Sequence, residues 1–197
     1  MIVMHAHIEN VEQTYAETYR CVANLKLAHP EYTYVDETTP KFDRWSYWYA
    51  INKYWGKDDL MLIDQDVIFD VSQFEQLRNC NHGWCCFYYM RSSQYNEKFV
   101  SAWDPAVPSS YTKATVPEFV AYASNGFMLI SKRLQTTPLM KFTVRTPIVE
   151  AKLGEGADNS IIKNIRITNP QLLIHLHGQI QHKPDPNQKY PPPPVYG

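Results

Sequence analysis

The stretch Leu60-Met61-Leu62-Ile63-Asp64-Gln65-Asp66 joins four consecutive apolar residues to two aspartates. A short apolar run of this kind is typical of a strand buried on both faces of a sheet. In an extended chain, residues two apart point to the same side, so Asp64 and Asp66 could meet one ligand. Open α/β sheets bind ligands at the carboxyl ends of their strands. The stretch therefore predicts a central strand that ends at a ligand site.

The segments around this stretch alternate between strand and helix patterns. Apolar residues recur at helical spacing from Val11 to Leu25, and again around Trp45 before Gly56. A short helix is expected at residues 159–164. The expected strands are residues 2–8, 32–35, 60–63, 84–90, 126–131 and 172–178. This alternation predicts an α/β fold with a mixed, mostly parallel central sheet flanked by helices.

Composition limits the class of protein. The 197 residues are 44% apolar and 20% charged, which excludes disorder, and the net charge of −1 argues against a nucleic-acid partner. The sequence has no apolar run of the ~18 residues that a membrane span needs, and its first residues do not form a signal peptide. Four cysteines in such a chain predict reduced thiols and a cytoplasmic protein.

Prolines mark the expected domain boundary. Six of the 14 prolines lie between Pro184 and Pro194, and four of them are consecutive. Consecutive prolines favour an extended polyproline segment. We expect one domain over residues 1–183, followed by a proline-rich tail, or a linker to further domains, over residues 184–197.

Two histidines form a second polar cluster after an apolar strand. His175 and His177 share one side of that strand, and Lys183 follows them. An imidazole beside two carboxylates suits manganese, and a lysine can neutralise a phosphate. The alternative is a strand with one buried, hydrogen-bonded histidine.

Two loops fit a sugar site. Gly126, in Ser124–Gly126, would let a ligand approach the backbone closely. In residues 154–160, Asp158 and Asn159 stand at the start of the expected helix. Asp158 is either the N-cap of that helix or a carboxylate placed to act on a reacting centre.

The order of these motifs resembles a known family. Asp64–Asp66, Ser124–Gly126, Ala157–Ile165 and His175–Pro184 follow one another as in the GT-A nucleotide-sugar glycosyltransferases, most closely the glycogenin-like, galactosyltransferase type. The chain departs from that pattern in having Ser-Asn-Gly for Asn-x-Gly, Asn159 for glutamine, and four residues between Gly178 and Lys183. The resemblance implies a GT-A, Rossmann-like domain, and its small size fits a virus-encoded minimal catalytic module.

The resemblance also implies roles for individual residues. Asp66 and His175 would bind Mn²⁺ or Mg²⁺, and Asp64 would contact the metal or the donor ribose. Asp158 and Asn159 would be catalytic, and the inverting and retaining outcomes both remain open. The donor would be a UDP-sugar and the acceptor a hydroxyl of a glycan or other molecule. The implied sugar contacts are Asn125, Gly126 and His177, and the nucleotide contacts are Ala6, His7, Asp36, Lys41, Arg44, Gln65 and Lys183.

Two other functions fit parts of the pattern. A haloacid-dehalogenase-like, magnesium-dependent phosphatase also begins from an apolar strand and DxD, although it normally carries that motif near the amino terminus. A non-catalytic module that binds nucleotide sugars or glycans would need the pocket but no chemistry at Asp158. Cys80, Cys85 and Cys86 lack the CxxC spacing of a zinc site, and we interpret them as buried thiols.

Overall fold

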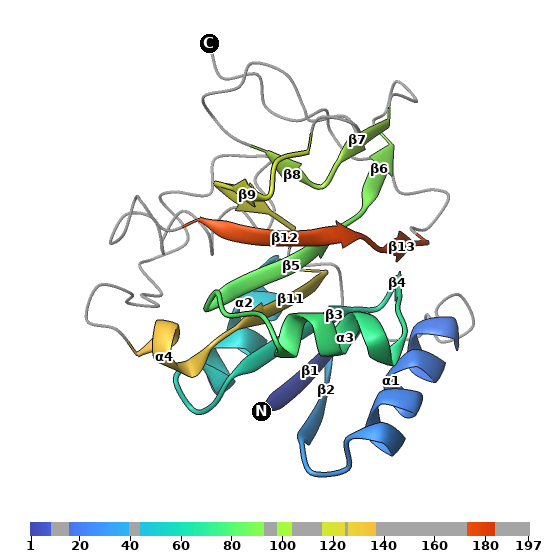
Figure 1. The fold of residues 1–197 in the computed structure, drawn as a ribbon. Coiled ribbons are helices and arrows are strands. Elements are labelled where there is room, and N and C mark those ends of the chain that lie inside the picture. Colours follow the sequence, from blue (N-terminus) through green and yellow to red (C-terminus); the bar gives the residue numbers. More distant parts are fainter. Residues whose placement is uncertain are drawn as a thin grey trace.

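The computed structural model describes residues 1–8, 16–39, 44–92, 98–103, 116–124, 126–136 and 173–183. Seven strands form one sheet in the order β2-β1-β3-β11-β5-β12-β9 (Figure 1). Five of them run in the same direction, and β9 and β11 run opposite. The predicted α/β fold with a mixed, mostly parallel sheet is confirmed. The bounds are β1 (Ile2–Ile8), β2 (Thr33–Thr39), β3 (Leu60–Asp64), β5 (Trp84–Tyr88), β9 (Phe119–Val120), β11 (Phe127–Ile130) and β12 (Ile174–Gln179).

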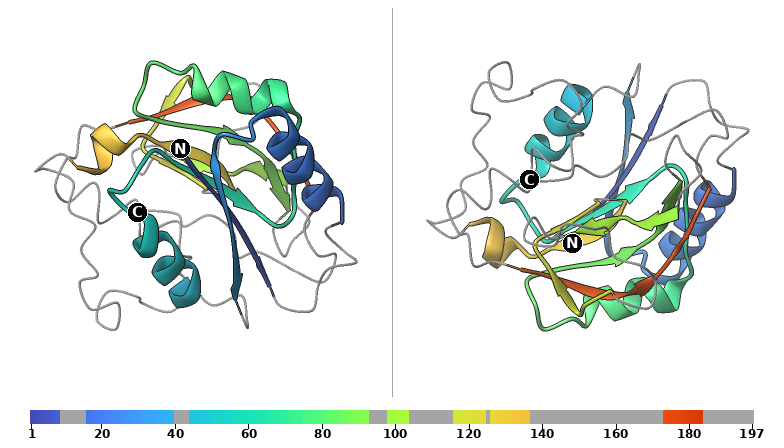
Figure 2. Two further views of the ribbon diagram at one scale, coloured as in Figure 1. Left: turned by 90° about the horizontal axis from the view of Figure 1, so that it is seen from below. Right: turned by 90° about the horizontal axis from the view of Figure 1, so that it is seen from above.

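Helices cover both faces of the sheet. Helices α1 (Ala16–Ala28) and α3 (Val71–Arg78) lie on one face, and α2 (Arg44–Tyr54) lies on the other (Figure 2). Each face has its own core, because alternate residues of a strand point to opposite sides. Met61 and Ile63 pack with the α1–α3 side, whereas Leu60 and Leu62 pack with the α2 side. All four residues of this run are fully buried, as the sequence predicted for β3.

Short elements surround the central sheet. Helix α4 (Lys132–Gln135) follows β11, and its N-cap Ser131 accepts a hydrogen bond from the Leu134 amide. Three two-stranded pairs complete the described structure: β4 (Val67–Ile68) with β13 (Gln181–His182), β6 (Met90–Ser92) with β7 (Lys98–Val100), and β8 (Ala102–Trp103) with β10 (Tyr122–Ala123).

The sequence patterns missed helix α3. Its N-cap is Asp70, whose carboxylate accepts a hydrogen bond from the Gln73 amide at 2.9 Å, while the Gln73 side chain accepts one from the Asp70 amide at 3.0 Å. This reciprocal capping box fixes the start of the helix, and it places Phe74 and Leu77 in the core. The helix expected at residues 159–164 lies outside the described residues.

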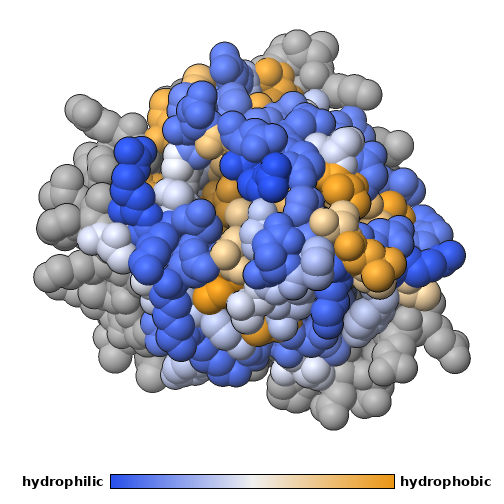
Figure 3. Space-filling model, turned by 60° about the horizontal axis from the view of Figure 1, so that its bottom comes forward, coloured by the Kyte–Doolittle hydropathy of each residue, from blue (hydrophilic) through white to orange (hydrophobic). Residues whose placement is uncertain are grey.

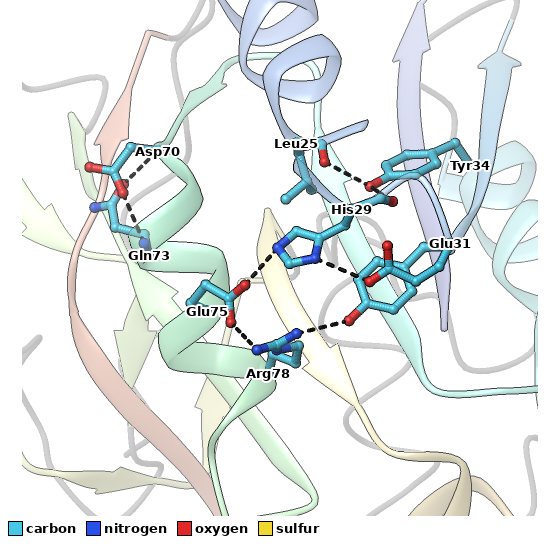
Figure 4. Close-up of polar contacts among 9 residues, drawn as sticks. Leu25, His29, Glu31, Tyr34, Asp70, Gln73, Glu75 and Arg78 are labelled. Carbon is cyan, nitrogen blue, oxygen red and sulfur yellow. Dashed lines mark hydrogen bonds and ion pairs between the residues drawn. The ribbon is translucent and has the colours of Figure 1, made fainter. Parts of the chain in front are cut away.

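An ion-pair network joins α1, β2 and α3 (Figure 4). His29, just after α1, lies between two carboxylates, with Nδ1 3.2 Å from Glu31 and Nε2 2.6 Å from Glu75. Arg78 reaches Glu75 at 2.6 Å. The Tyr34 hydroxyl lies within hydrogen-bonding distance of the carbonyl oxygens of Leu25 and His29, which also accept from the backbone amides of His29 and Tyr32. These contacts hold the end of α1 against β2 and α3.

The surface shown in Figure 3 is mainly hydrophilic, and its hydrophobic residues lie in separate small groups. Leu27 of α1 is the most exposed large apolar side chain among the described residues. None of the described helices combines the length and the apolar composition that a membrane crossing requires.

Candidate active site

The two aspartates of the sequence motif lie at the carboxyl end of β3. Asp64 is the last residue of the strand, and Gln65 and Asp66 form the turn into β4. Gln65 and Asp66 are buried at 3% and 5% exposure, whereas Asp64 is half-buried. The Asp64 amide donates to the Gly126 carbonyl at 2.8 Å, which fixes the strand end against the start of β11.

His182 is the histidine that contacts Asp66, and the sequence did not single it out. Its Nε2 lies 3.0 Å from Oδ2 of Asp66, and both side chains are almost inaccessible to water. Strand β13 carries His182 and pairs antiparallel with β4, so that His182 stands opposite Val67. The Lys183 amide donates to the Asp66 carbonyl at 2.8 Å. Backbone pairing therefore fixes His182 and Lys183 on the turn that carries Asp64 and Asp66, which we call the DxD turn.

A bulge directs the end of β12 towards this turn. The pairing with β5 shifts between Leu176 and Gln179, so that three steps along β12 match two steps along β5. Gly178 lies inside the bulge with φ +152°, a backbone conformation that side-chain-bearing residues rarely adopt. After the bulge, Gln179 still pairs with Tyr88 of β5, and the Ile180 amide donates to the Tyr88 carbonyl at 2.8 Å. Because a bulge bends its strand, the chain then leaves the sheet, and Gln181 and His182 pair with β4.

Tyr89 and Gly126 pack between Asp64 and His182. The Tyr89 ring stacks on the His182 ring with centroids 4.1 Å apart and planes at 15°. A Cβ placed on Gly126 would lie 2.7 Å from Cε1 of Tyr89 and 3.3 Å from Oδ2 of Asp64. Only glycine fits there without displacing one of these groups. Gly126, an expected sugar contact, therefore lies directly against Asp64, while Asn125 lies outside the described residues.

Lys183 lies on the surface beside this cluster. Its ammonium forms an ion pair with Glu17 in the first turn of α1. The hydrogen bond from Lys183 lowers the pKa of the Glu17 carboxyl. This contact brings the start of α1 to the carboxyl edge of the sheet, where the sequence placed Lys183.

The structure does not bring His175 to the aspartates. His175 aligns through β5 and β11 with Met61, three residues before Asp64, and β12 is three strands away from β3. The separation is therefore ~10 Å along the strands and ~14 Å across them. Both His175 and His177 lie towards α3 instead, where His175 Nδ1 is 3.2 Å from the Cys80 thiol and His177 stacks on Phe87. The physical reason is position along the chain: His175 lies near the start of β12, whereas His182 lies beyond its end on β13, which pairs with β4 beside Asp66.

The expected nucleotide contacts occupy the neighbouring strands. Ala6 pairs with Asp64 across β1 and β3, and Gln65 lies in the DxD turn. Asp36, expected after the second strand, lies inside β2, where its Oδ1 is 3.0 Å from Nδ1 of His5. That hydrogen bond holds the pKa of Asp36 below its usual value. Arg44 begins α2, and its side chain, like Lys41, Asp158 and Asn159, lies outside the described residues.

A group of aromatic and imidazole rings lines the end of β1. His5 and His7 stack with centroids 5.3 Å apart, and Tyr19 of α1 meets both edge-on. His5 is 1% exposed, and its Nε2 has no hydrogen-bond partner among the described residues. His5 belongs to this group although the sequence reasoning named only His7. The sequence could have indicated this, because His5 and His7 are two residues apart in the expected strand 2–8 and therefore point to the same side.

Two groups of three metal-ligating side chains have donor atoms within 4.8 Å of one another among the described residues: His5 with His7 and Asp36, and Cys80 with Cys85 and His177. Asp64, Asp66 and His182 are less tightly gathered. The 3.0 Å contact between Asp66 and His182 nevertheless offers an oxygen and a nitrogen donor to one cation, a donor set that suits Mn²⁺. Asp64 needs a side-chain movement to complete this group.

Comparison with known proteins supports the fold only. No protein-family model matches the chain, and no curated sequence is significantly similar to it. The solved structure of A197 from STIV matches 93% of this chain and 85% of its own, with a TM-score of 0.57 and 14% identity. The chain shares the fold of A197.

Two further structures are more distant. A glycosyltransferase involved in the glycosylation of the major capsid of PBCV-1 covers 90% of this chain and 81% of its own at 12% identity, with a TM-score of 0.47. A CMP:2-keto-3-deoxy-manno-octonic acid synthetase complexed with CTP covers 93% and 91% at 7% identity, with a TM-score of 0.42.

Proposed function

We propose that this protein is a metal-dependent glycosyltransferase with a GT-A fold that moves a sugar from a UDP-sugar to a hydroxyl of a glycan or another acceptor. One observation carries the proposal: β13 sets His182 and Lys183 on the turn that holds Asp64 and Asp66. Carboxylates and an imidazole then lie at the carboxyl edge of a mostly parallel sheet, and the Lys183 ammonium lies nearby, paired with Glu17. That edge is where open α/β folds bind ligands.

Asp66 and His182 would hold the cation, Mn²⁺ or Mg²⁺, together with Asp64. When bound, the cation stabilises the negative charge that develops on the diphosphate leaving group as the glycosidic bond breaks. His182 takes the role that the sequence assigned to His175. The stacked Tyr89 ring fixes the plane of the imidazole, and the Asp66 contact directs Nε2 towards the acidic turn.

Lys183 would contribute a second positive charge to the diphosphate. Its backbone is fixed by the hydrogen bond to Asp66, whereas its half-exposed ammonium is held by Glu17. A surface ion pair of this kind is worth ~0–1 kcal/mol, so a diphosphate can replace Glu17 as the partner of Lys183. Asp158 and Asn159 remain the proposed catalytic residues, and Asn125 and Lys41 remain proposed substrate contacts.

Calorimetry with UDP, in Mn²⁺ and in chelator, tests the proposal. We expect UDP to bind with Mn²⁺ and to bind much more weakly without it. Asp66→Asn and His182→Gln should each weaken binding in Mn²⁺ by at least about 10- to 100-fold, the cost typical of changes in the groups around a metal, because a neutral amide replaces a charged carboxylate or an imidazole donor. Asp70→Asn is the matched control, since it removes a carboxylate four residues from Asp66 but keeps a good N-cap.

Two outcomes would contradict the proposal. Equal UDP binding with Mn²⁺ and with chelator would show that no metal ion takes part in binding the donor. Phosphate release from small phosphomonoesters would favour the phosphatase alternative. Melting temperatures of the variants separate binding from folding, because a variant that stays folded and loses only UDP binding has lost a ligand. Release of UDP from UDP-sugars, tested across donors with Mn²⁺, then distinguishes an enzyme from a binding module.

A further inference from the structure

A second group of metal-ligating side chains lies away from the DxD turn, on the face of the sheet that α3 covers. Cys80 lies in the turn between α3 and β5, Cys85 is in β5, and His175 and His177 are on the neighbouring strand β12. His175 stands directly opposite Cys85 in the parallel pairing. The sequence spacing of the cysteines did not suggest a metal site, because half of the group comes from about 90 residues further along the chain.

The donor atoms already lie close to the spacing of a metal site. The ligand atoms of Cys80, Cys85 and His177 are all within 4.8 Å of one another, and the Cys80 thiol is 3.2 Å from Nδ1 of His175. Zinc bonds of ~2.3 Å to sulfur and ~2.0 Å to nitrogen place tetrahedral ligands roughly 3.3–3.8 Å apart. Small side-chain rotations would close the group around one ion.

Each of the two histidines has a ring nitrogen placed to serve as a metal ligand. Nε2 of His175 lies 3.3 Å from the Glu118 carboxylate, which leaves Nδ1 facing Cys80. A carboxylate behind a ligating imidazole fixes its orientation and raises its basicity. His177 Nε2 is buried and has no hydrogen-bond partner among the described residues. Burial, and then the neighbouring His175 and His82, lower the pKa of His177.

We propose that Cys80, Cys85, His175 and His177 bind one zinc ion in a closed, four-coordinate site. Two thiolates and two imidazoles neutralise Zn²⁺, and thiolate ligands disfavour the hard ions that suit the DxD turn. Binding deprotonates both thiols, so each zinc displaces two protons. The site would fasten the turn after α3 to β12, the strand that leads to His182. It does not depend on the proposed transferase function.

Cobalt titration of the reduced full-length protein tests the site, because tetrahedral Co²⁺ with thiolate ligands gives sulfur-to-metal charge-transfer bands and intense visible bands. We expect one equivalent to bind, and zinc to displace it. Cys85→Ala should abolish the charge-transfer band, and His177→Gln should weaken it. Cys86→Ala is the matched control: Cys86 is the next residue of β5 and equally buried, but it belongs to the opposite core.

Three results would overturn the proposal. The first is a wild-type titration without charge-transfer bands, and the second is a Cys86→Ala variant that loses cobalt as Cys85→Ala does. The third is a Cys80–Cys85 disulfide in the native protein, detected as a mass lower by two hydrogen atoms, together with no metal uptake after that disulfide is reduced. The first result is obtained with the wild-type protein, so it does not depend on whether any variant folds. Metal analysis of protein purified without chelator, with one zinc per chain expected, provides a second readout.

Discussion

At the scale of the residue, Gly126 is the most constrained position of the candidate active site. Its missing side chain leaves room for the Tyr89 ring and for the Asp64 carboxylate. The Tyr89 ring in turn supports His182. One small residue therefore sets the relative positions of an acid, an aromatic ring and an imidazole.

Gly126→Ala should weaken both stability and UDP binding. The new Cβ would lie 2.7 Å from a Tyr89 ring carbon, and both are buried, so we expect a loss of about 1–3 kcal/mol in the free energy of unfolding. Urea unfolding and calorimetry with UDP and Mn²⁺ measure the two effects. Adding Tyr89→Leu should recover part of the stability but not the binding. Normal UDP binding by Gly126→Ala would show that this packing does not position the site.

At the scale of the element, β2 is tied to α1 by the Tyr34 hydroxyl. Burial raises the pKa of Tyr34 from 10.0 to about 12. The unfolded chain therefore loses this proton at a lower pH than the native protein does. The stabilisation is complete below pH 10.0 and is lost as the pH rises towards about 12.

Tyr34→Phe tests this tie. The free energy of unfolding should fall between about pH 10 and pH 12 more steeply in the wild type than in the variant, by about 1–2 kcal/mol over the interval. Denaturant unfolding across this range measures the difference, and titration of the other tyrosines is common to both proteins. Parallel pH profiles would mean that Tyr34 is not shielded as the structure indicates.

Helix α3 and strand β12 show how far local patterns reach. The buried strand β3 was predictable because a run of four apolar residues is typical of a strand that is covered on both faces. Asp70 and Gln73 form a capping box, but helix α3 was still missed. Its eight residues bury only Phe74 and Leu77, and two apolar residues are too few to show a helical period. The bulge at Gly178 depends on pairing with β5, which no local pattern encodes.

At the scale of the whole molecule, β12 links the two proposed metal sites. One end carries His175 and His177, which lie near Cys80 and Cys85, and the other leads to His182 and Asp66. The sites differ in donor chemistry, since one offers mainly oxygen and the other sulfur and nitrogen. Chelators can therefore remove the two metals separately.

Stepwise metal removal should have two distinct effects. Withdrawing Mn²⁺ with a weak chelator should abolish UDP binding with little change in melting temperature. Withdrawing zinc with a strong chelator under reducing conditions should lower the melting temperature, because β12 loses its tie to α3, and should weaken UDP binding even after Mn²⁺ is restored. Thermal melting and calorimetry at each step measure both. An unchanged melting temperature after complete zinc removal would contradict the structural role.

The sequence alone determined the α/β class, the central buried strand and the acidic pair at its end, because apolar runs and strand periodicity are local properties. It also placed Lys183 near the ligand edge of the sheet. Only the tertiary structure decided which histidine meets Asp66, since β13 pairs with β4 and brings His182 there, while His175 stays on β12, three strands from β3. It likewise gathered Cys80, Cys85 and His177, because strand order in a sheet joins segments whose separation along the chain says nothing of their separation in space.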